Sequence, residues 1–268
     1  MKKGFVSVII PAYRQERTIV RDLRSIKRAV DNLNIPYEII CVIDGRIDKT
    51  FSEAHKFARD NSRMQVVGYK ENRGKGYAVR YGMAKSKGDI IAFIDAGMDL
   101  DPNGLNMCLE HFYWYSADVV VGSKRHPASK VYYPWQRRVL SWGYQMLVRI
   151  LFGLNIKDTQ VGLKFFRRAV LEKTLPRLLV KAFAFDIEML AVANYLGFKK
   201  IYEAPVEIKM QFGGASSVTS KGFFKTLLHM LRDTLAVFYR LRILRYYSDK
   251  NQRKWKYDPD LDFRVNVG

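Results

Sequence analysis

Residues 5–45 read FVSVIIPAYRQERTIVRDLRSIKRAVDNLNIPYEIICVIDG and contain the unit that decides the fold. The run from Phe5 to Ile10 is apolar and rich in β-branched residues, and Pro11 ends it, as is typical of a buried strand. Apolar side chains then recur at helical spacing, with Arg and Lys between them. A second apolar run, residues 37–43, predicts another strand. The stretch therefore predicts a strand, a helix and a strand in turn.

The same alternation continues to about residue 121. Further strands are predicted at residues 64–69, 89–94 and 118–121, and further helices at 51–59 and 76–86. Strands joined by helical crossovers pair in parallel, because each crossover returns the chain to the same end of the sheet. We therefore expect an α/β fold, with a mostly parallel, Rossmann-like sheet, helices on both faces and amphipathic helices after it.

The charge of the chain is unevenly distributed. The 268 residues carry a net charge of +20, and residues 121–268 hold 27 basic and 11 acidic side chains, a net of +16. Such an excess predicts an anionic partner, either phosphate, nucleic acid or an acidic membrane surface. No zinc, helix-turn-helix or RNA-binding signature is recognisable, so we do not expect nucleic acid.

The two cysteines, Cys41 and Cys108, each lie in an apolar run, and we expect both to be reduced core residues of a cytoplasmic protein. No secretory leader pattern follows the first residues. No stretch reaches the roughly 18 apolar residues that a membrane-spanning helix needs. If the protein meets a membrane, we expect it to lie at the cytoplasmic face as a peripheral protein.

Polar residues follow the predicted strands at the points where they end. They are Pro11-Ala12-Tyr13, Asp44-Gly45, Asn72-Arg73-Gly74-Lys75-Gly76 and Asp95-Ala96-Gly97-Met98-Asp99. Ligands of such sheets bind beyond the carboxyl ends of the strands. An aromatic ring, a glycine-rich loop with a lysine, and several carboxylates should therefore meet at one edge.

These segments resemble the family 2 glycosyltransferases of the GT-A fold, and among them the dolichyl- or polyprenyl-phosphate hexose synthases. The similar segments are Val8–Tyr13, Asn72–Gly76 with Gly82, Ala84, Gly88 and Asp89, then Asp95, Gly122–Arg125, Asp158–Lys164 and Phe185–Glu188. The likeness runs from about residue 5 to 245, and Asp158–Lys164 is most similar to the dolichyl-phosphate glucosyltransferases. It implies inverting transfer of a hexose from a UDP-glucose or GDP-mannose type of donor to a polyprenyl or dolichyl phosphate.

The resemblance also implies a donor site at the sheet edge. Its residues would be Pro11, Ala12, Tyr13, Glu16, Asp44, Lys75, Asp95 and Ala96. Tyr13 and Asp44 stand where the family holds the base and ribose, and Lys75 can approach the donor phosphates. Ile43 occupies a common base-reading position, which leaves the choice of base open.

A divalent cation is implied as well. In the family an Asp-X-Asp after the fourth strand, followed two residues later by Gln or Asp, binds Mg²⁺ or Mn²⁺, metals that carboxylate oxygens suit. Asp95 fits the first position and Asp99 the last, whereas Gly97 replaces the middle Asp. The cation would stabilise the charge that gathers on the leaving diphosphate.

The acceptor side favours a lipid phosphate. A phosphate is already ionised near neutral pH, so it needs positioning by basic side chains and no general base. The resemblance places Arg125, Arg137 and Arg138 at the acceptor phosphate. Lys209, near the end of the last strand, is a further candidate contact, and we expect Asp95, Arg125 and Arg138 to be the catalytic residues.

Two other functions stay open. A related transferase with a saccharide acceptor would use Asp186 as its base, although that side chain is equally suited to a helix N-terminus. A non-catalytic basic binding protein is the other.

We expect three parts, a catalytic domain over residues 1–220, basic amphipathic membrane-facing helices over 221–250 and a partly ordered polar tail over 251–268. Between Gly222 and Tyr247 apolar and aromatic residues alternate with basic ones. A helix of this kind can lie at the surface of an anionic leaflet, or it can pack on the catalytic domain.

Overall fold

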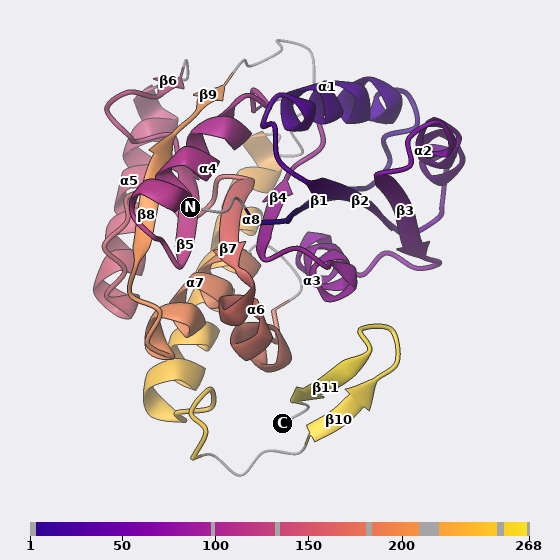
Figure 1. The fold of residues 1–268 in the computed structure, drawn as a ribbon. Coiled ribbons are helices and arrows are strands. Elements are labelled where there is room, and N and C mark those ends of the chain that lie inside the picture. Colours follow the sequence, from indigo (N-terminus) through magenta and orange to yellow (C-terminus); the bar gives the residue numbers. More distant parts are fainter. Residues whose placement is uncertain are drawn as a thin grey trace.

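The computed structural model describes residues 4–97, 100–131, 135–180, 184–208, 220–250 and 255–266. Within them the main sheet has seven strands in the order β3-β2-β1-β4-β7-β5-β8 (Figure 1). The strands are β1 (Val6–Ala12), β2 (Tyr37–Asp44), β3 (Met64–Tyr69), β4 (Ile90–Ile94), β5 (Val119–Ser123), β7 (Leu163–Arg167) and β8 (Ile201–Pro205). The expected α/β fold with a mostly parallel sheet is confirmed, as are the five predicted strands.

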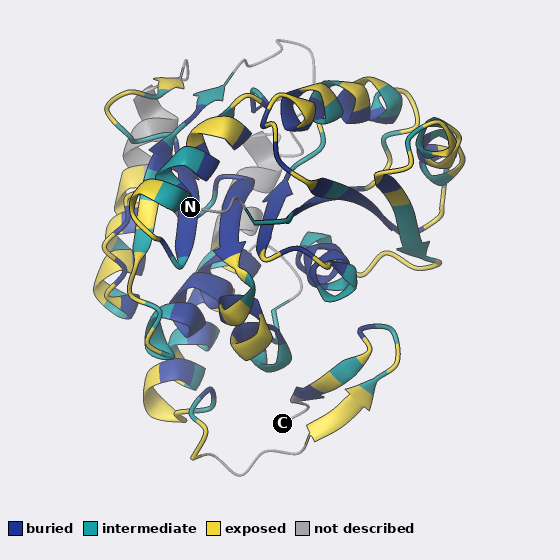
Figure 2. Cartoon of the chain, in the orientation of Figure 1, coloured by how far each residue is buried: buried dark blue, intermediate teal, exposed yellow. Residues whose placement is uncertain are grey.

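Helices cover both faces of this sheet (Figures 1 and 2). One face packs against α1 (Ile19–Asp31), α2 (Thr50–Arg59) and α4 (Gly104–Trp114). The other packs against α3 (Lys75–Lys85), α5 (Trp135–Phe152), α6 (Arg168–Thr174), α7 (Phe185–Tyr195) and α8 (Ser220–Phe238). Successive side chains of β1 point to opposite faces of the sheet. Val8 and Ile10 pack in the core with α1, α2 and α4, and Ile9 packs in the core on the other face. Cys41 and Cys108 are buried free thiols, as expected.

One strand of the sheet departs from the expected alternation. β7 enters between β4 and β5 and pairs antiparallel with both, so that Phe93 lies opposite Lys164. This strand begins within the Asp158–Lys164 segment, which was quoted for its resemblance, but the sequence pattern did not identify it as a strand. Its entry brings residues 161–164 beside the carboxyl end of β4, where the candidate site lies.

The remaining elements are short. β6 (Lys130–Val131) pairs with β9 (Glu207–Ile208), the 3-10 helix η1 (Leu175–Arg177) follows α6, and the π-helical turn η2 (Tyr239–Ile243) continues α8. Residues 255–266, expected to be partly ordered, form an antiparallel hairpin of β10 (Trp255–Asp258) and β11 (Phe263–Asn266). None of the helices in the described ranges is both long and apolar enough to cross a membrane.

Candidate active site

Asp44 organises the loop between β3 and α3. It ends β2 and is 3% exposed. One carboxylate oxygen accepts hydrogen bonds from the Tyr69 hydroxyl at 3.0 Å and the Arg73 amide at 2.7 Å, and the other accepts one from Asn72 Nδ2 at 2.9 Å. Burial, together with the negative charge of Asp44, raises the pKa of Tyr69. The carboxylate therefore fixes the glycine-rich loop against the sheet.

Lys75 and Asp95 meet at the centre of this edge. Gly74 has a φ of 90°, a left-handed conformation that favours glycine, and it turns the chain into α3 at Lys75. The Lys75 ammonium donates to Asp95 Oδ2 at 2.6 Å. Burial opposes the charge of Lys75, but the carboxylates of Asp95 and Asp186 outweigh it and raise the pKa of Lys75. Two residues predicted for donor binding are thus in direct contact.

Gly162 is a site residue to which the sequence assigned no role. The Asp95 amide donates to the Gly162 carbonyl at 2.9 Å. A Cβ added to Gly162 would lie 2.0 Å from Asp95 Oδ2, closer than any two such atoms can approach. A side chain at position 162 would therefore displace the Asp95 carboxylate from the position seen here. The sequence signal for Gly162 was its place in the Asp158–Lys164 segment.

One carboxylate at this edge, that of Asp95, suits a divalent cation whose other ligands would include the phosphate oxygens of a donor. Asp95 Oδ1 is buried and has no hydrogen-bond partner within the described ranges, so it is available as a hard oxygen ligand. Among the residues that the structure describes, no three His, Cys, Asp or Glu side chains gather to hold a metal without help. Asp99, the second predicted ligand, lies outside them. Gly97 has a φ of 118°, which gives a conformational reason for glycine in place of the usual Asp.

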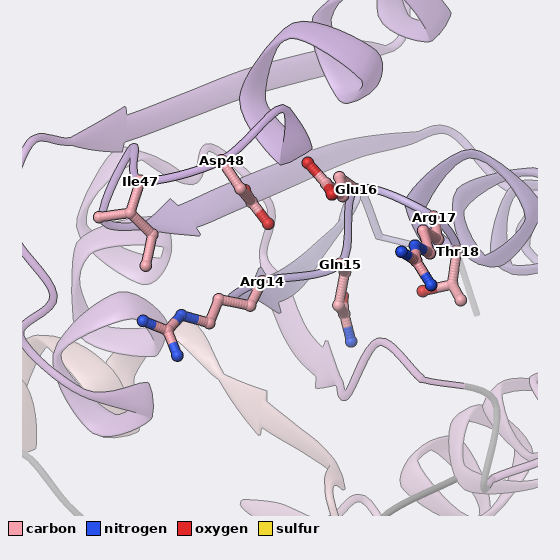
Figure 3. A pocket seen from close by; sticks show the side chains of 7 residues that line it. All are labelled: Arg14, Gln15, Glu16, Arg17, Thr18, Ile47 and Asp48. Carbon is pink, nitrogen blue, oxygen red and sulfur yellow. The ribbon is translucent and has the colours of Figure 1, made fainter. Parts of the chain in front are cut away.

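The loops after β1 and β2 enclose a second part of the edge. A pocket of about 560 Å³ is lined there by Arg14, Gln15, Glu16, Arg17, Thr18, Ile47 and Asp48 (Figure 3). Gln15 and Glu16 point to opposite sides of their loop (Figure 3). The backbone amide of Gln15 donates to Thr50 Oγ1 at 2.8 Å, and the Glu16 carboxylate accepts from the backbone amide of Lys49 at 3.2 Å. Glu16 therefore joins the two loops to each other.

The other predicted donor residues lie at or just after the carboxyl ends of β1 and β4. Pro11 and Ala12 are buried at the end of β1, and Ala96 packs partly against the core. The Tyr13 ring is 40% exposed, and the Arg14 guanidinium lies 5.3 Å from its centre. An exposed ring at a strand end can stack on a flat base. The structure thus brings Tyr13 to the surface at the edge where Asp44 holds the neighbouring loop.

Asp186 is held in a buried ion pair. Its Oδ1 accepts from Lys164 Nζ at 2.7 Å, and the same ammonium donates to the Val161 carbonyl at 2.6 Å. The side chain of Lys164 is fully buried, and burial lowers its pKa although the charge of Asp186 opposes this effect. The alternative role of Asp186 as a general base is therefore disfavoured, because its carboxylate already stabilises a buried cation. The sequence signal that could have identified Lys164 as the partner of Asp186 is its position between the apolar residues Leu163 and Phe165.

Arg125 lines a separate pocket beside α5. The pocket encloses about 210 Å³, and its walls are Arg125, Trp142, Gln145, Met146, Arg149, Ile156 and Lys157. The Asp158 carboxylate accepts hydrogen bonds from the backbone amides of Lys124 and Gln160, at 3.1 Å each. These bonds connect the loop of Arg125 to the segment that contains Gly162. Arg137 and Arg138 lie on α5, but their side chains are outside the described part, as is Lys209 altogether.

The model of the family "Glycosyl transferase family 2" matches residues 7–175. The dolichyl-phosphate beta-glucosyltransferase of Drosophila melanogaster is 30% identical over 94% of this chain and 79% of its own length. That of Homo sapiens is 31% identical over 89% and 76%.

The fold has solved counterparts. Glucosyl-3-phosphoglycerate synthase from Mycobacterium tuberculosis, crystallised with Mn²⁺, uridine diphosphate and phosphoglyceric acid, superposes with a TM-score of 0.63 over 98% of this chain and 87% of that one. Its sequence identity is 20%, so the likeness concerns the fold, which is the expected Rossmann-like GT-A architecture. The family model and the two relatives together assign the sequence: this chain belongs to glycosyl transferase family 2.

Proposed function

We propose that this glycosyltransferase moves a hexose from a nucleotide-sugar to a polyprenyl- or dolichyl-type lipid phosphate. The observation that carries the proposal is the pocket beside α5. It combines three cationic side chains, Arg125, Arg149 and Lys157, with apolar walls from Trp142, Met146 and Ile156. A phosphate monoester with a hydrocarbon tail has matching chemistry. The names of the relatives, dolichyl-phosphate beta-glucosyltransferases, support the same acceptor.

The reaction requires one displacement. An oxygen of the acceptor phosphate forms a bond to the anomeric carbon, the bond from that carbon to the diphosphate breaks, and the nucleoside diphosphate leaves. Attack from the opposite face inverts the anomeric centre. No proton has to be removed from the nucleophile, which is consistent with Asp186 being paired to Lys164.

The donor side follows from the edge around Asp95. Lys75 would neutralise the leaving diphosphate once it exchanges its partner Asp95 for phosphate oxygens. Asp95, with Asp99 as the second candidate, would hold Mg²⁺ or Mn²⁺, which when bound stabilises negative charge on the leaving group. The Mn²⁺ and uridine diphosphate in the crystals of the structural counterpart support this assignment. UDP-glucose is the donor that we would test first and GDP-mannose the second.

The role of Arg125 can be separated from donor binding. In Arg125→Ala, we expect kcat/KM for a short polyprenyl phosphate to fall about 10- to 100-fold, as for loss of a charge-assisted hydrogen bond. The affinity for UDP-glucose, measured by calorimetry, should not change. Arg59→Ala, an exposed position on α2, is the control and should behave as wild type. An equal loss of kcat/KM for the lipid phosphate and of affinity for UDP-glucose would instead assign Arg125 to the donor diphosphate.

We further propose that residues 221–250 bring the catalytic domain, residues 1–220, to the cytoplasmic face of an anionic membrane. α8 and η2 have one packed face with Val237 and Leu241, while apolar side chains remain outside. These exposed residues are Leu228, Leu235, Tyr239 and Ile243; Leu244 follows η2, and α5 adds Trp142, Met146 and Ile150. α5 and α8 are in contact through the Tyr144 and Thr234 hydroxyls, 2.8 Å apart. Helix α5 therefore lines the acceptor pocket and also carries part of the exposed apolar surface.

Vesicle binding tests this docking. Arg240 lies 3.9 Å from the buried Glu188, so the exposed Arg232 and Arg242 are the better residues to change. A basic side chain near an anionic surface contributes about 1 kcal/mol, so Arg232→Gln with Arg242→Gln should weaken binding to phosphatidylserine vesicles about 10- to 30-fold. The control, Arg28→Gln with Arg59→Gln, removes the same charge from α1 and α2 on the other face of the sheet.

Co-sedimentation at low and high salt measures the effect, because ions screen exposed charges. Equal weakening in the two double variants would make the attraction a property of net charge rather than of α8. A wild-type protein that ignores vesicles at low salt would refute the docking.

A further inference from the structure

The C-terminal hairpin reaches the donor-site loop although it lies far from it in sequence. Arg73 Nη1 donates to Asp260 Oδ2 at 2.6 Å, across 187 positions of the chain. The Tyr77 hydroxyl contacts the same carboxylate oxygen at 3.3 Å. Beneath this pair, Leu261 and Val265 form a small apolar cluster with Tyr77, so the hairpin is packed on α3 as well as ion-paired to the loop before it.

Arg73 connects the hairpin to the site through its own backbone. Its side chain points to Asp260, whereas its amide donates to Asp44 Oδ1 at 2.7 Å. The guanidinium also lies 5.4 Å from the centre of the Tyr69 ring, and the Tyr69 hydroxyl donates to the same Asp44 oxygen. Two residues later, Lys75 contacts Asp95. Asp260 is thus linked to Asp44 through Arg73, whose side chain contacts Asp260 and whose backbone amide bonds to Asp44.

We propose that Asp260 is a positioning residue, through which the C-terminal hairpin holds the loop Asn72–Lys75 in the conformation that receives the donor diphosphate. This inference rests on the proposed function. Its physical basis is conformational freedom, since a loop with Gly74 at a φ of 90° has many alternatives when it is not held. An anchored loop loses less entropy on binding its ligand, which increases affinity.

Asp260→Asn tests the proposal in the full chain. The ion pair is partly exposed, so we expect a modest effect, an about two- to fivefold weaker affinity for UDP-glucose with Mn²⁺ by calorimetry. The KM for the donor should rise in proportion while kcat and the KM for the lipid phosphate stay constant. Amide hydrogen exchange at Arg73 should become faster by a similar factor, because its bond to Asp44 would open more often. Asp260→Glu, which keeps the charge, should restore most of both.

Two comparisons separate positioning from general stability. Asp262→Asn removes the same charge from the same hairpin, where the Asp262 carboxylate accepts from the Tyr257 hydroxyl, and it should leave both readouts unchanged. In an Arg73→Gln background, Asp260→Asn should have no further effect, since Asp260 acts through Arg73. Unchanged exchange at Arg73 in Asp260→Asn, or equal changes in Asp262→Asn, would overturn the proposal. If wild type binds no nucleotide-sugar, the proposed function fails, while the exchange measurement still decides whether the hairpin holds the loop.

Discussion

Asp95→Asn is expected to lower the rate of hexose transfer about 100-fold or more, as for lost electrostatic stabilisation of a leaving group. Asp95 is the one described carboxylate at the edge with both a lysine contact and a buried oxygen that lacks a partner in the described ranges. Asparagine keeps the shape and removes the charge, so the fold should persist. Initial rates with UDP-glucose, a short polyprenyl phosphate and increasing Mn²⁺ measure the effect.

The control for this substitution is Asp60→Asn, at the exposed end of α2, which should keep wild-type rates. Excess EDTA should abolish turnover of the wild-type enzyme, and Mn²⁺ or Mg²⁺ should restore it. Full activity in EDTA would contradict the cation assignment. A small loss in Asp95→Asn together with sensitivity to EDTA would instead make Asp99 the main ligand.

Lys164→Met is expected to lower the free energy of unfolding by about 3–5 kcal/mol, because removing one partner leaves a buried charge uncompensated. The stranded group is Asp186, which is 5% exposed and bonded to Lys164 at 2.7 Å. Methionine keeps the length and apolar stem of lysine, so packing against Phe93 should change little. Urea unfolding followed by circular dichroism measures the loss.

The double variant Lys164→Met with Asp186→Leu distinguishes charge from packing. Replacing both members of a buried pair by apolar residues is often neutral, so most of the lost stability should return. If the double variant is as unstable as the single one, the pair is not the source of the effect. Transfer activity retained in the double variant would also exclude Asp186 as a general base.

Much of the fold and part of the site were predictable from local pattern. The apolar runs and helical spacings between residues 5 and 121 identified five strands, and the parallel rule placed Asp44, Lys75 and Asp95 at one edge. The contact of Lys75 with Asp95 agrees with that placement. Such inferences succeed because strand periodicity and crossover direction are local properties, and because every parallel strand delivers its next residue to the same edge.

The site also depends on pairs that no local pattern contains. Antiparallel β7 brings Gly162 against Asp95, and the same strand places Lys164 within reach of Asp186 on α7. Asp260 reaches Arg73 only because the tail folds back as a hairpin. Sequence alone determined the alternation of strands and helices, the basic second half and the residues at the strand ends. Tertiary structure decided which of those residues are in contact. An ion pair, or a steric need for glycine, arises only when segments that are distant in sequence lie within a few ångströms of each other.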